Sequence, residues 1–545
     1  MRSIARRRAV LSFIVASALA VGGALAVAAP AEAATPGGGI AGVDVSKTVN
    51  WSTAPAGTQF AYIEAAISTT RNGSFYANWS GATRAGIPRG AYAFGEPNKT
   101  ASNGATQARF FYANGGALST ANPSSLPPVL DIEYDAKGGC WGLSTAQAQN
   151  WIASYVSTFK SISGVTPVIY TNMTYWKNCV GKSTMLKNYP LWVVDTSSAK
   201  APTLGQGGWT SWKFRQYKLD QGNFDLDEFH GTLAQLTALG SPRNAGADRF
   251  ETGVSASLAF ASGVKTVYIA SGANFPDALS AGAAAGKAAG PVLLVNTSSV
   301  PADVAHALQY LNPAKVVITG GTTAISASVA TTLKKVVPKA TFTRLQGADR
   351  FATSAAIATT SFPAGVANAY VAMATDWPDA LSGSALAASA TGSGPMLLVQ
   401  GGSVPASITK ALATLKPKHI TVLGGTAVVQ QSVLTTLSRY GSVSRIAGAD
   451  RFATSALIAA KLRSVAGSSW GGSAYIASGI NFPDALVAGP LAALTSSPVL
   501  LTQTATVPTQ ISAELSRLAP SSIALMGGSA SINAAVQAKV LSYRK

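Results

Sequence analysis

The sequence predicts an α/β protein in which one β/α barrel precedes three parallel-sheet α/β modules. Residues 40–240 alternate short apolar runs with helical stretches and contain no internal repeat, and about 200 residues of this kind can close into one barrel. Residues 243–545 instead hold three copies of one pattern of apolar strands and Ala-rich helices, which indicates repeated modules with parallel sheets. A chain of 545 residues is also too long for one core.

The N-terminus has the form of an export signal. The basic segment MRSIARRRAV precedes the apolar stretch LSFIVASALAVGGALAVAA, and AEA supplies a small-x-small cleavage site, so we expect a signal peptide over residues 1–33. An uncleaved anchor is the alternative, which the short apolar core disfavours. The arginine cluster leaves Sec and Tat export both open. No later stretch is long and apolar enough to span a bilayer, so we expect a secreted mature protein without a membrane span.

Acidic side chains end two predicted strands of the first half. Asp44 follows the apolar run GIAGV, and Asp131 and Glu133 follow PPVL. Because side chains alternate along a strand, Asp131 and Glu133 share one face. The carboxyl ends of barrel strands meet at one rim, so these acids can converge in one cleft. The alternative is that the strands have ended and the acids are simply solvated.

The only two cysteines are Cys140 and Cys179. In an exported chain a single pair most simply forms a disulfide. It would close a loop of about 40 residues and stabilise the fold by about 3–4 kcal/mol in the chain-entropy model. Two cysteines and three scattered histidines make no ligand cluster, so we expect no metal site.

The order of motifs in residues 34–240 resembles glycoside hydrolase family 25, the lysozymes that cut bacterial peptidoglycan. The matching segments are GVDVS (42–46), GAYAF (90–94), LDIE (130–133), VIYTN (168–172), PLWV (190–193), RQY (215–217) and FDLDEFHG (224–231). The resemblance implies a modified TIM-type barrel whose last strands lack full helices. It also implies hydrolysis of the β-1,4 bond between N-acetylmuramic acid and N-acetylglucosamine in glycan strands. The cysteine pair resembles one in actinobacterial members.

The resemblance assigns roles to four acids. Glu133 matches the proton donor of the family. Its carboxyl must stay protonated near neutral pH, and burial together with negative charge from Asp131 would supply that shift. Asp44 and Asp225 match the acids after the first and last strands, and would stabilise an oxocarbenium-like transition state and orient the 2-acetamido group or a water. Which group acts as the base stays open.

Further candidates for substrate binding surround these acids. Tyr92, Tyr170 and Trp192 fit sugar-stacking or cleft-wall positions, with ordinary barrel packing as the alternative. Family members commonly read KATEG where this chain reads EAAIS (64–68), so Glu64 replaces a lysine. Other departures replace a cleft histidine by Ala93 and place Asp195 and Thr196 after the LW motif. We therefore expect either a lysozyme with altered substrate preference or a degenerate barrel that binds glycan without cutting it. The retention of all four carboxylates favours activity.

Three landmarks recur in the same order through the second half. The segments RNAGADRF, RLQGADRF and RIAGADRF begin at Arg243, Arg344 and Arg445, each 101 residues after the one before. Each is followed by a PDAL segment, by an apolar strand that begins with proline, and by a strand that ends in Gly-Gly. The Gly-Gly pairs lack the spacing of a nucleotide loop, so we interpret them as tight turns and expect no cofactor.

These repeats resemble the cell wall binding type 2 repeats of Gram-positive bacteria, which usually come in threes. We place their boundaries at 241–342, 343–443 and 444–545. The resemblance implies non-covalent anchoring to an anionic polymer of the cell wall. Charge agrees, because the chain from residue 241 onward carries 22 Lys and Arg against 10 Asp and Glu. Nucleic acid is the alternative polyanion, and both export and the lack of a base-stacking aromatic pattern argue against it.

The recurring arginine of each GADRF segment, Arg249 in the first copy, stands beside an aspartate. An internal ion pair between these neighbours is the expectation, with polymer binding as the alternative.

Taken together, the sequence predicts a secreted wall enzyme whose barrel cuts glycan while three basic repeats hold it on the wall. The rival hypothesis is a non-catalytic, wall-anchored surface protein.

Overall fold

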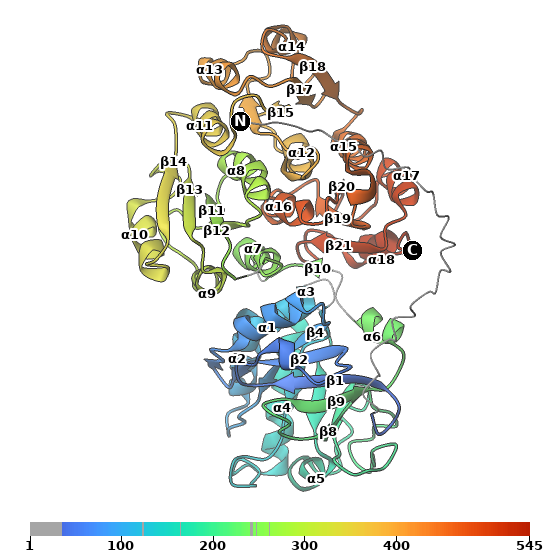
Figure 1. Ribbon diagram of the computed structural model, residues 1–545. Helices are drawn as coiled ribbons and strands as arrows, with labels where there is room; N and C mark the ends of the chain where they lie inside the picture. The colour runs from blue at the N-terminus through green and yellow to red at the C-terminus, as the bar shows by residue number, and fades with distance from the viewer. Residues whose placement is uncertain (1–34, 122–124, 164, 240–242, 247, 261) are drawn as a thin grey trace, which may run out of the picture.

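The computed structural model describes residues 35–121, 125–163, 165–239, 243–246, 248–260 and 262–545. The expected signal peptide, residues 1–33, therefore lies outside the described residues. Within the described part of the chain, no helix has the length and apolar character needed to cross a membrane. A barrel, blue to green in Figure 1, lies beside a group of three repeats, green to red.

Eight strands close the barrel, as the sequence predicts. Seven run parallel, and the last, β9, is antiparallel to both of its neighbours, β8 and β1. The strands in chain order are β1 (Ile40–Val45), β2 (Phe60–Ile67), β4 (Arg89–Phe94), β5 (Val129–Asp131), β6 (Val168–Thr171), β7 (Leu191–Val194), β8 (Phe214–Lys218) and β9 (Asp225–Phe229). A short strand, β3 (Thr70–Arg71), extends the end of β2 as a hairpin.

Full helices cover only the first part of the barrel. They are α1 (Phe75–Arg84), α2 (Ala101–Phe111), α3 (Ala117–Ala121) and α4 (Thr145–Ser163). After β6 the helix is reduced to α5 (Met173–Tyr175) and a π-turn, and residues 195–213 hold no helix. The connection from β8 to β9 is only residues 219–224, too short for a parallel crossover, so β9 returns antiparallel. This confirms the expectation of missing late helices. Helix α6 (Leu233–Leu239) leads to the repeats.

Aromatic rings fill the barrel interior. Tyr62 packs against Trp192 with ring centroids 4.7 Å apart, and Phe60 packs against Phe214 at 5.4 Å. These rings belong to one buried cluster that lies inside the strands. A barrel interior packed in this way is a core, so chemistry is confined to the rim at the strand ends.

Each repeat contains a four-stranded parallel sheet covered by helices. The sheets in spatial order are β12-β11-β13-β14, β16-β15-β17-β18 and β20-β19-β21-β10. The strands are β10 (Arg243–Asn244), β11 (Thr266–Ser271), β12 (Val292–Val295), β13 (Lys315–Thr319), β14 (Thr341–Leu345), β15 (Asn368–Met373), β16 (Met396–Val399), β17 (His419–Leu423), β18 (Ser442–Ile446), β19 (Ser473–Ser478), β20 (Val499–Thr502) and β21 (Ser522–Met526). The helices are α7 (Arg249–Ser257), α8 (Pro276–Lys287), α9 (Ala302–Leu311), α10 (Ala327–Val336), α11 (Arg350–Ser361), α12 (Pro378–Ala388), α13 (Ala406–Leu415), α14 (Gln431–Leu437), α15 (Arg451–Ala466), α16 (Ala488–Ala493), α17 (Thr509–Leu518) and α18 (Ala534–Leu541).

The three repeats close into a ring (Figure 1). The edge strands β14 and β18 begin the second and third copies, yet each completes the sheet of the copy before it. The ring closes because β10, at the start of the first copy, pairs with β21 of the third. Helices α8, α12 and α16 pack together at the centre. A Cβ at Gly286 of α8 would lie 2.2 Å from the Cβ of Ala388 in α12, so this close approach requires glycine.

The recurring charged residues of the GADRF segments fix local structure, although differently from our expectation. Asp248 accepts hydrogen bonds from the amides of Phe250 and Glu251, so it caps α7. Its neighbour Arg249 donates to the carbonyl of Gly272 at 2.6 Å. The same arrangement recurs in the other two copies. In the described residues no ion pair joins these arginines to the adjacent aspartates, so that part of the sequence analysis was wrong.

The arginine that begins each copy holds the edge strand in place. Arg243 is buried and donates to the carbonyls of Gly527 and Ile532 at 2.9 and 2.6 Å and to the side chain of Gln537 at 2.7 Å. Arg344 makes the equivalent carbonyl contacts in the first sheet. These bonds cross from the start of one copy to the end of another.

Replacing Arg243 with alanine should lower the free energy of unfolding of the repeats by about 3 kcal/mol, because two buried carbonyls lose their donor. Urea unfolding followed by circular dichroism measures this change. The exposed Arg544, changed to alanine, is the matched control. Equal losses in both variants would show that β10 does not clamp the ring.

The barrel docks on the first repeat through α1 and α9. The hydroxyl of Tyr76 donates to Asp303 at 3.1 Å, and Arg71 lies 3.9 Å from the same carboxyl. Arg84 contacts the hydroxyl of Tyr310. Polar side chains therefore fix the barrel against the ring.

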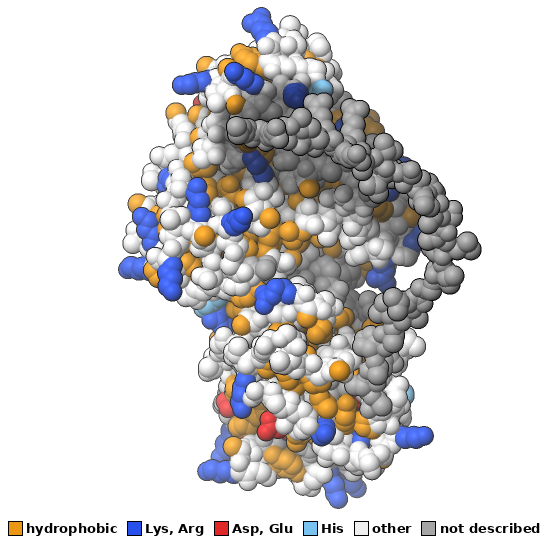
Figure 2. Space-filling model, in the orientation of Figure 1, with side chains coloured by type: hydrophobic (Ala, Val, Ile, Leu, Met, Phe, Trp, Pro, Cys, Tyr) orange, Lys and Arg blue, Asp and Glu red, His pale blue; other side chains and the backbone are white. Residues whose placement is uncertain are grey.

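On the face drawn in Figure 2, Lys and Arg side chains are spread over the repeats and acidic side chains are sparse.

Candidate active site

A cavity of about 160 Å³ opens at the carboxyl ends of the barrel strands. It gathers five carboxyl groups from four separate strand ends. It includes the four acids expected to be catalytic and the four residues expected to bind substrate, Glu64, Tyr92, Tyr170 and Trp192. The lining residues are Asp44, Ser46, Glu64, Tyr92, Phe94, Val129, Asp131, Glu133, Tyr170, Trp192, Gln216 and Asp225. Larger hollows occur in the repeats, and among the described residues the most acidic of them is lined by three aspartates, Asp376, Asp379 and Asp450.

The end of β5 supplies two of these acids. Strand alternation places Asp131 and Glu133 on the cavity side, and Ile132 points into the apolar packing with no exposed surface. Burial raises the pKa of Glu133 and, more strongly, that of Asp131, to which the charge of Glu133 also contributes. One oxygen of Asp131 is buried without a hydrogen-bond donor among the described residues. The pair is therefore suited to hold a proton near neutral pH.

Asp44 and Asp225 face each other across the pairing of β1 with β9. Gln216 of β8 joins them, because its amide nitrogen donates to Asp44 at 2.6 Å and to Asp225 at 3.4 Å. The oxygen of the same amide accepts from the hydroxyl of Tyr170 at 2.8 Å. Burial raises the pKa of Asp44 to about 7, with the charge of Asp225 as the next cause. Burial also raises the pKa of Asp225.

Gln216 was not among the residues singled out from the sequence. It stands in the middle of the RQY motif, where strand alternation puts it on the opposite face from its two neighbours. A polar residue at the single inward position of an otherwise recognised motif is the signal that could have identified it.

Glu64 and the aromatic candidates also line the cavity. Glu64 accepts a hydrogen bond from the side chain of Asn72 at 2.6 Å, and burial raises its pKa. Trp192 is only 1% exposed and packs against Tyr170 with ring centroids 5.0 Å apart. Tyr92 is also buried, with a small exposed edge. All three aromatic side chains thus contribute to barrel packing as well as to the cavity wall.

Comparison with known proteins identifies the barrel and the repeats. The family model of Glycosyl hydrolases family 25 matches residues 43–225, and that of Cell wall binding domain 2 matches residues 243–330, 344–434 and 445–537. Lysozyme M1 of Streptomyces globisporus is 40% identical over 214 residues, which cover 37% of this chain and 71% of that protein. This chain belongs to glycosyl hydrolase family 25. It is a glycoside hydrolase of the lysozyme and muramidase family with three cell wall binding repeats, which confirms both resemblances.

Two further proteins are similar to this family 25 chain. The N,O-diacetylmuramidase of Chalaropsis sp is 36% identical over 179 residues, which cover 31% of this chain and 83% of that protein. The solved structure of Cwp6 from Clostridium difficile has a TM-score of 0.50 and 26% identity, and it covers 55% of this chain. The match spans about half of that protein, 47%.

A disulfide fixes the loop that follows the acid pair of this family 25 barrel. Cys140 is bonded to Cys179, as expected. The loop is further held by Asp135, which accepts from the amides of Gly139 and Lys137 at 2.9 and 2.8 Å. These backbone donors lower the pKa of Asp135. The third acid of the DIEYD segment is therefore a half-buried loop cap and does not line the cavity.

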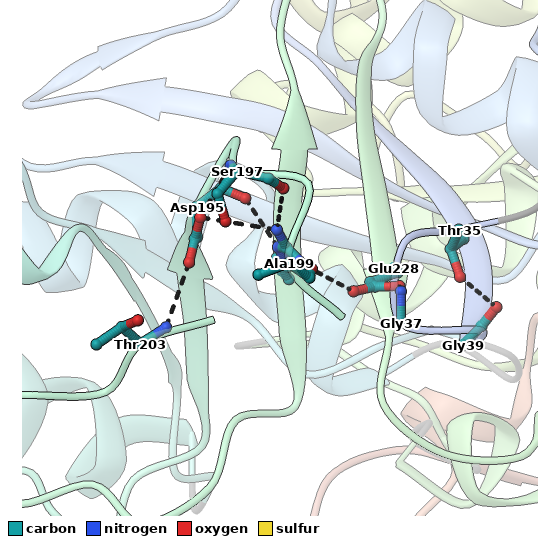
Figure 3. Close-up of polar contacts among 9 residues, drawn as sticks. Thr35, Gly37, Gly39, Asp195, Ser197, Ala199, Thr203 and Glu228 are labelled. Carbon is teal, nitrogen blue, oxygen red and sulfur yellow. Dashed lines mark hydrogen bonds and ion pairs between the residues drawn. The ribbon is translucent and has the colours of Figure 1, made fainter. Parts of the chain in front are cut away.

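A second polar cluster supports β8 and β9 from outside the barrel (Figure 3). Arg215 is fully buried, lies 3.5 Å from Glu228, and donates to the carbonyls of Asp195, Ser197 and Ala199 at 2.8, 2.6 and 2.7 Å. Figure 3 also shows Glu228 accepting from the amide of Gly37. The cluster ties the helix-free connection of residues 195–203 to the strands. Asp195 was expected in the cleft, but it belongs to this outer cluster.

Proposed function

We propose that this chain is an exported N-acetylmuramidase. It would cleave the β-1,4 bond between N-acetylmuramic acid and N-acetylglucosamine in the glycan strands of peptidoglycan. The observation that carries the proposal is the convergence of carboxyl groups from β1, β2, β5 and β9 in one cavity of a family 25 barrel. The names of the two relatives, a lysozyme and a muramidase, support the same substrate.

Glu133 is the proposed proton donor. Its carboxyl is half-buried, and burial raises its pKa, which favours the protonated form that can protonate the glycosidic oxygen as the bond to the anomeric carbon breaks. Asp131 lies two residues before Glu133. The charge of Glu133 raises the pKa of Asp131, so the two carboxyls are not readily ionised at the same time. The free buried oxygen of Asp131 is available to a donor on the sugar, such as the amide of the 2-acetamido group. Asp44 and Asp225 carry the negative charge that stabilises the oxocarbenium-like transition state.

The cavity wall supplies substrate contacts in this proposal. Tyr92, Tyr170 and Trp192 line the cavity and can pack against the sugars, and Glu64 adds a carboxylate that can accept from sugar hydroxyls. After the bond breaks, a water adds to the anomeric carbon and returns a proton to the site. Digestion of purified peptidoglycan tests the function, because mass spectrometry of new reducing ends distinguishes muramic acid ends from glucosamine ends. Glucosamine ends alone would contradict the proposed bond.

The repeats are proposed to bind an anionic polymer of the cell wall. Their excess of Lys and Arg supports this, because a basic surface attracts a polyanion. Anchoring would raise the concentration of glycan around the barrel without new contacts in the cleft.

Acid extraction of the anionic polymers from whole walls should reduce retention of the protein about tenfold or more, because the electrostatic partner is removed. A pull-down with walls before and after extraction measures this, and residues 243–545 alone should behave as the full chain does. Equal retention on both wall samples would exclude polymer anchoring.

A further inference from the structure

Asp227 is a buried carboxyl beside the proposed catalytic acids, although it does not line the cavity. It lies on β9 two residues after Asp225, so both side chains point into the barrel. In the pairing of β9 with β1, Asp225 is opposite Asp44 and Asp227 is opposite Gly42. Asp227 is therefore a diagonal neighbour of Asp44 on the inner face of the barrel, at a spacing that side chains can bridge. Asp227 has no exposed surface.

The two oxygens of Asp227 have different surroundings. Oδ1 accepts a hydrogen bond from the indole nitrogen of Trp192 at 3.1 Å. Oδ2 is buried and has no nitrogen or hydroxyl donor among the described residues. The side chains of Asp227 and Asp44 lie close enough to share a hydrogen bond once one of them carries a proton. Because Oδ1 already accepts from Trp192, Oδ2 is the oxygen left for that bond. Two carboxyl groups in such contact share a proton, because two adjacent buried carboxylates would repel each other.

The geometry decides which of the two carboxyls keeps the proton. Asp44 Oδ2 accepts from Gln216 at 2.6 Å, and this short bond stabilises the carboxylate form of Asp44. Asp227 has only the longer bond from Trp192 and is more deeply buried. Two charged groups oppose a second negative charge on Asp227, namely Asp44 on β1 and Asp225 on its own strand. The other titratable groups close enough to interact with Asp227 are Tyr62 on β2, Tyr170 on β6 and Tyr217 on β8, and their raised pKa values keep them neutral.

We propose that Asp227 is a positioning residue whose protonated carboxyl donates from Oδ2 to Asp44 and so orients Asp44 and keeps it ionised. Asp44 is then held from two sides, by Gln216 and by Asp227, with its charge available to the transition state. The pKa shifts agree with this order, since burial raises the pKa of Asp227 well above its usual range, whereas burial raises that of Asp44 only to about 7 and hydrogen bonds with Gln216 and Asp227 counteract part of that rise. The catalytic part of this inference rests on the proposed function.

Two variants of Asp227 distinguish the effect of its hydrogen bond to Asp44 from the effect of its charge. Asp227→Asn keeps a neutral donor of the same shape, so kcat/KM should stay within about threefold of wild type, as should the acid limb of the pH–rate profile. Asp227→Leu removes the donor. It should lower kcat/KM about 10- to 100-fold and move the acid limb upward by about one pH unit, because Asp44 then ionises less readily. A purely structural role would lower activity without moving this limb. Loss of more than 100-fold in folded Asp227→Asn, or an unshifted limb in Asp227→Leu, would overturn the inference.

A stability titration tests the proton on Asp227 without using activity. The folded chain keeps this proton, whereas the unfolded chain loses it near pH 4, so wild type should lose stability relative to Asp227→Asn as the pH rises from 4 to 8. Urea unfolding of both proteins at each pH measures the difference. A difference that does not change with pH would overturn the inference. If wild type releases no muramic acid ends, the proposed function fails, while this titration still decides where the proton lies.

Discussion

Glu133→Gln should lower the hydrolysis of purified peptidoglycan about 10³-fold or more, which corresponds to about 4 kcal/mol of transition-state stabilisation. Glutamine has nearly the shape of glutamic acid but carries no transferable proton, so the leaving oxygen would depart as an alkoxide. Because burial raises the pKa of Glu133, ionisation of this group lowers the free energy of unfolding of wild type. The variant should therefore fold at least as stably as wild type near neutral pH.

The measurement for Glu133→Gln is the rate of release of reducing ends, with products identified by mass spectrometry. Asp220→Asn is the matched control. Asp220 is exposed near the same rim, its carboxyl does not line the cavity, and its φ of 52° is one that asparagine tolerates. This control should retain wild-type activity. Activity in Glu133→Gln comparable with wild type would reject Glu133 as the proton donor. An absence of products from wild type as well, across several wall types, would favour a non-catalytic wall protein.

Asp44→Asn should lower kcat/KM about 10²- to 10³-fold, because it removes a buried negative charge close to the cation that develops in the transition state. The asparagine amide can still accept from Gln216, so the local hydrogen bonding survives. The pH–rate profile gives the second readout. Wild type should lose activity as the pH falls below about 7, where Asp44 takes up a proton, and this limb should be missing from the residual activity of the variant.

The stability of Asp44→Asn should change with pH in a defined direction. The pKa of Asp44 is raised from 3.8 to about 7, so the folded chain holds a proton that the unfolded chain has released. Wild type should therefore lose stability relative to the variant as the pH rises from 3.8 to about 7, and the difference should stay constant above that. Urea unfolding at several pH values measures it. If the variant had a lower free energy of unfolding than wild type at pH 8, the charge of Asp44 would not destabilise the folded protein.

The sequence was informative wherever a function depends on a local pattern. Acids directly after apolar strands predicted the cavity carboxyls, because the carboxyl ends of barrel strands meet at one rim whatever their exact tilt. Landmarks repeated every 101 residues predicted the modules, because each copy must build the same sheet. The loss of the late helices followed from the family resemblance alone, because only the connection from β8 to β9, residues 219–224, is too short to hold a helix.

Contacts between distant segments leave no such pattern, and only the tertiary structure reveals them. Gln216 binds Asp44 across 172 residues of sequence, and Arg243 binds Gly527 across 284. The role of Asp227 depends on a diagonal neighbour on another strand, and the outward position of Asp195 depends on Arg215. The residues that make up the barrel and the repeats could therefore be predicted from local strand and helix patterns. The proton distribution in the cleft and the closure of the ring could not, because both depend on burial and on which segments the fold brings together.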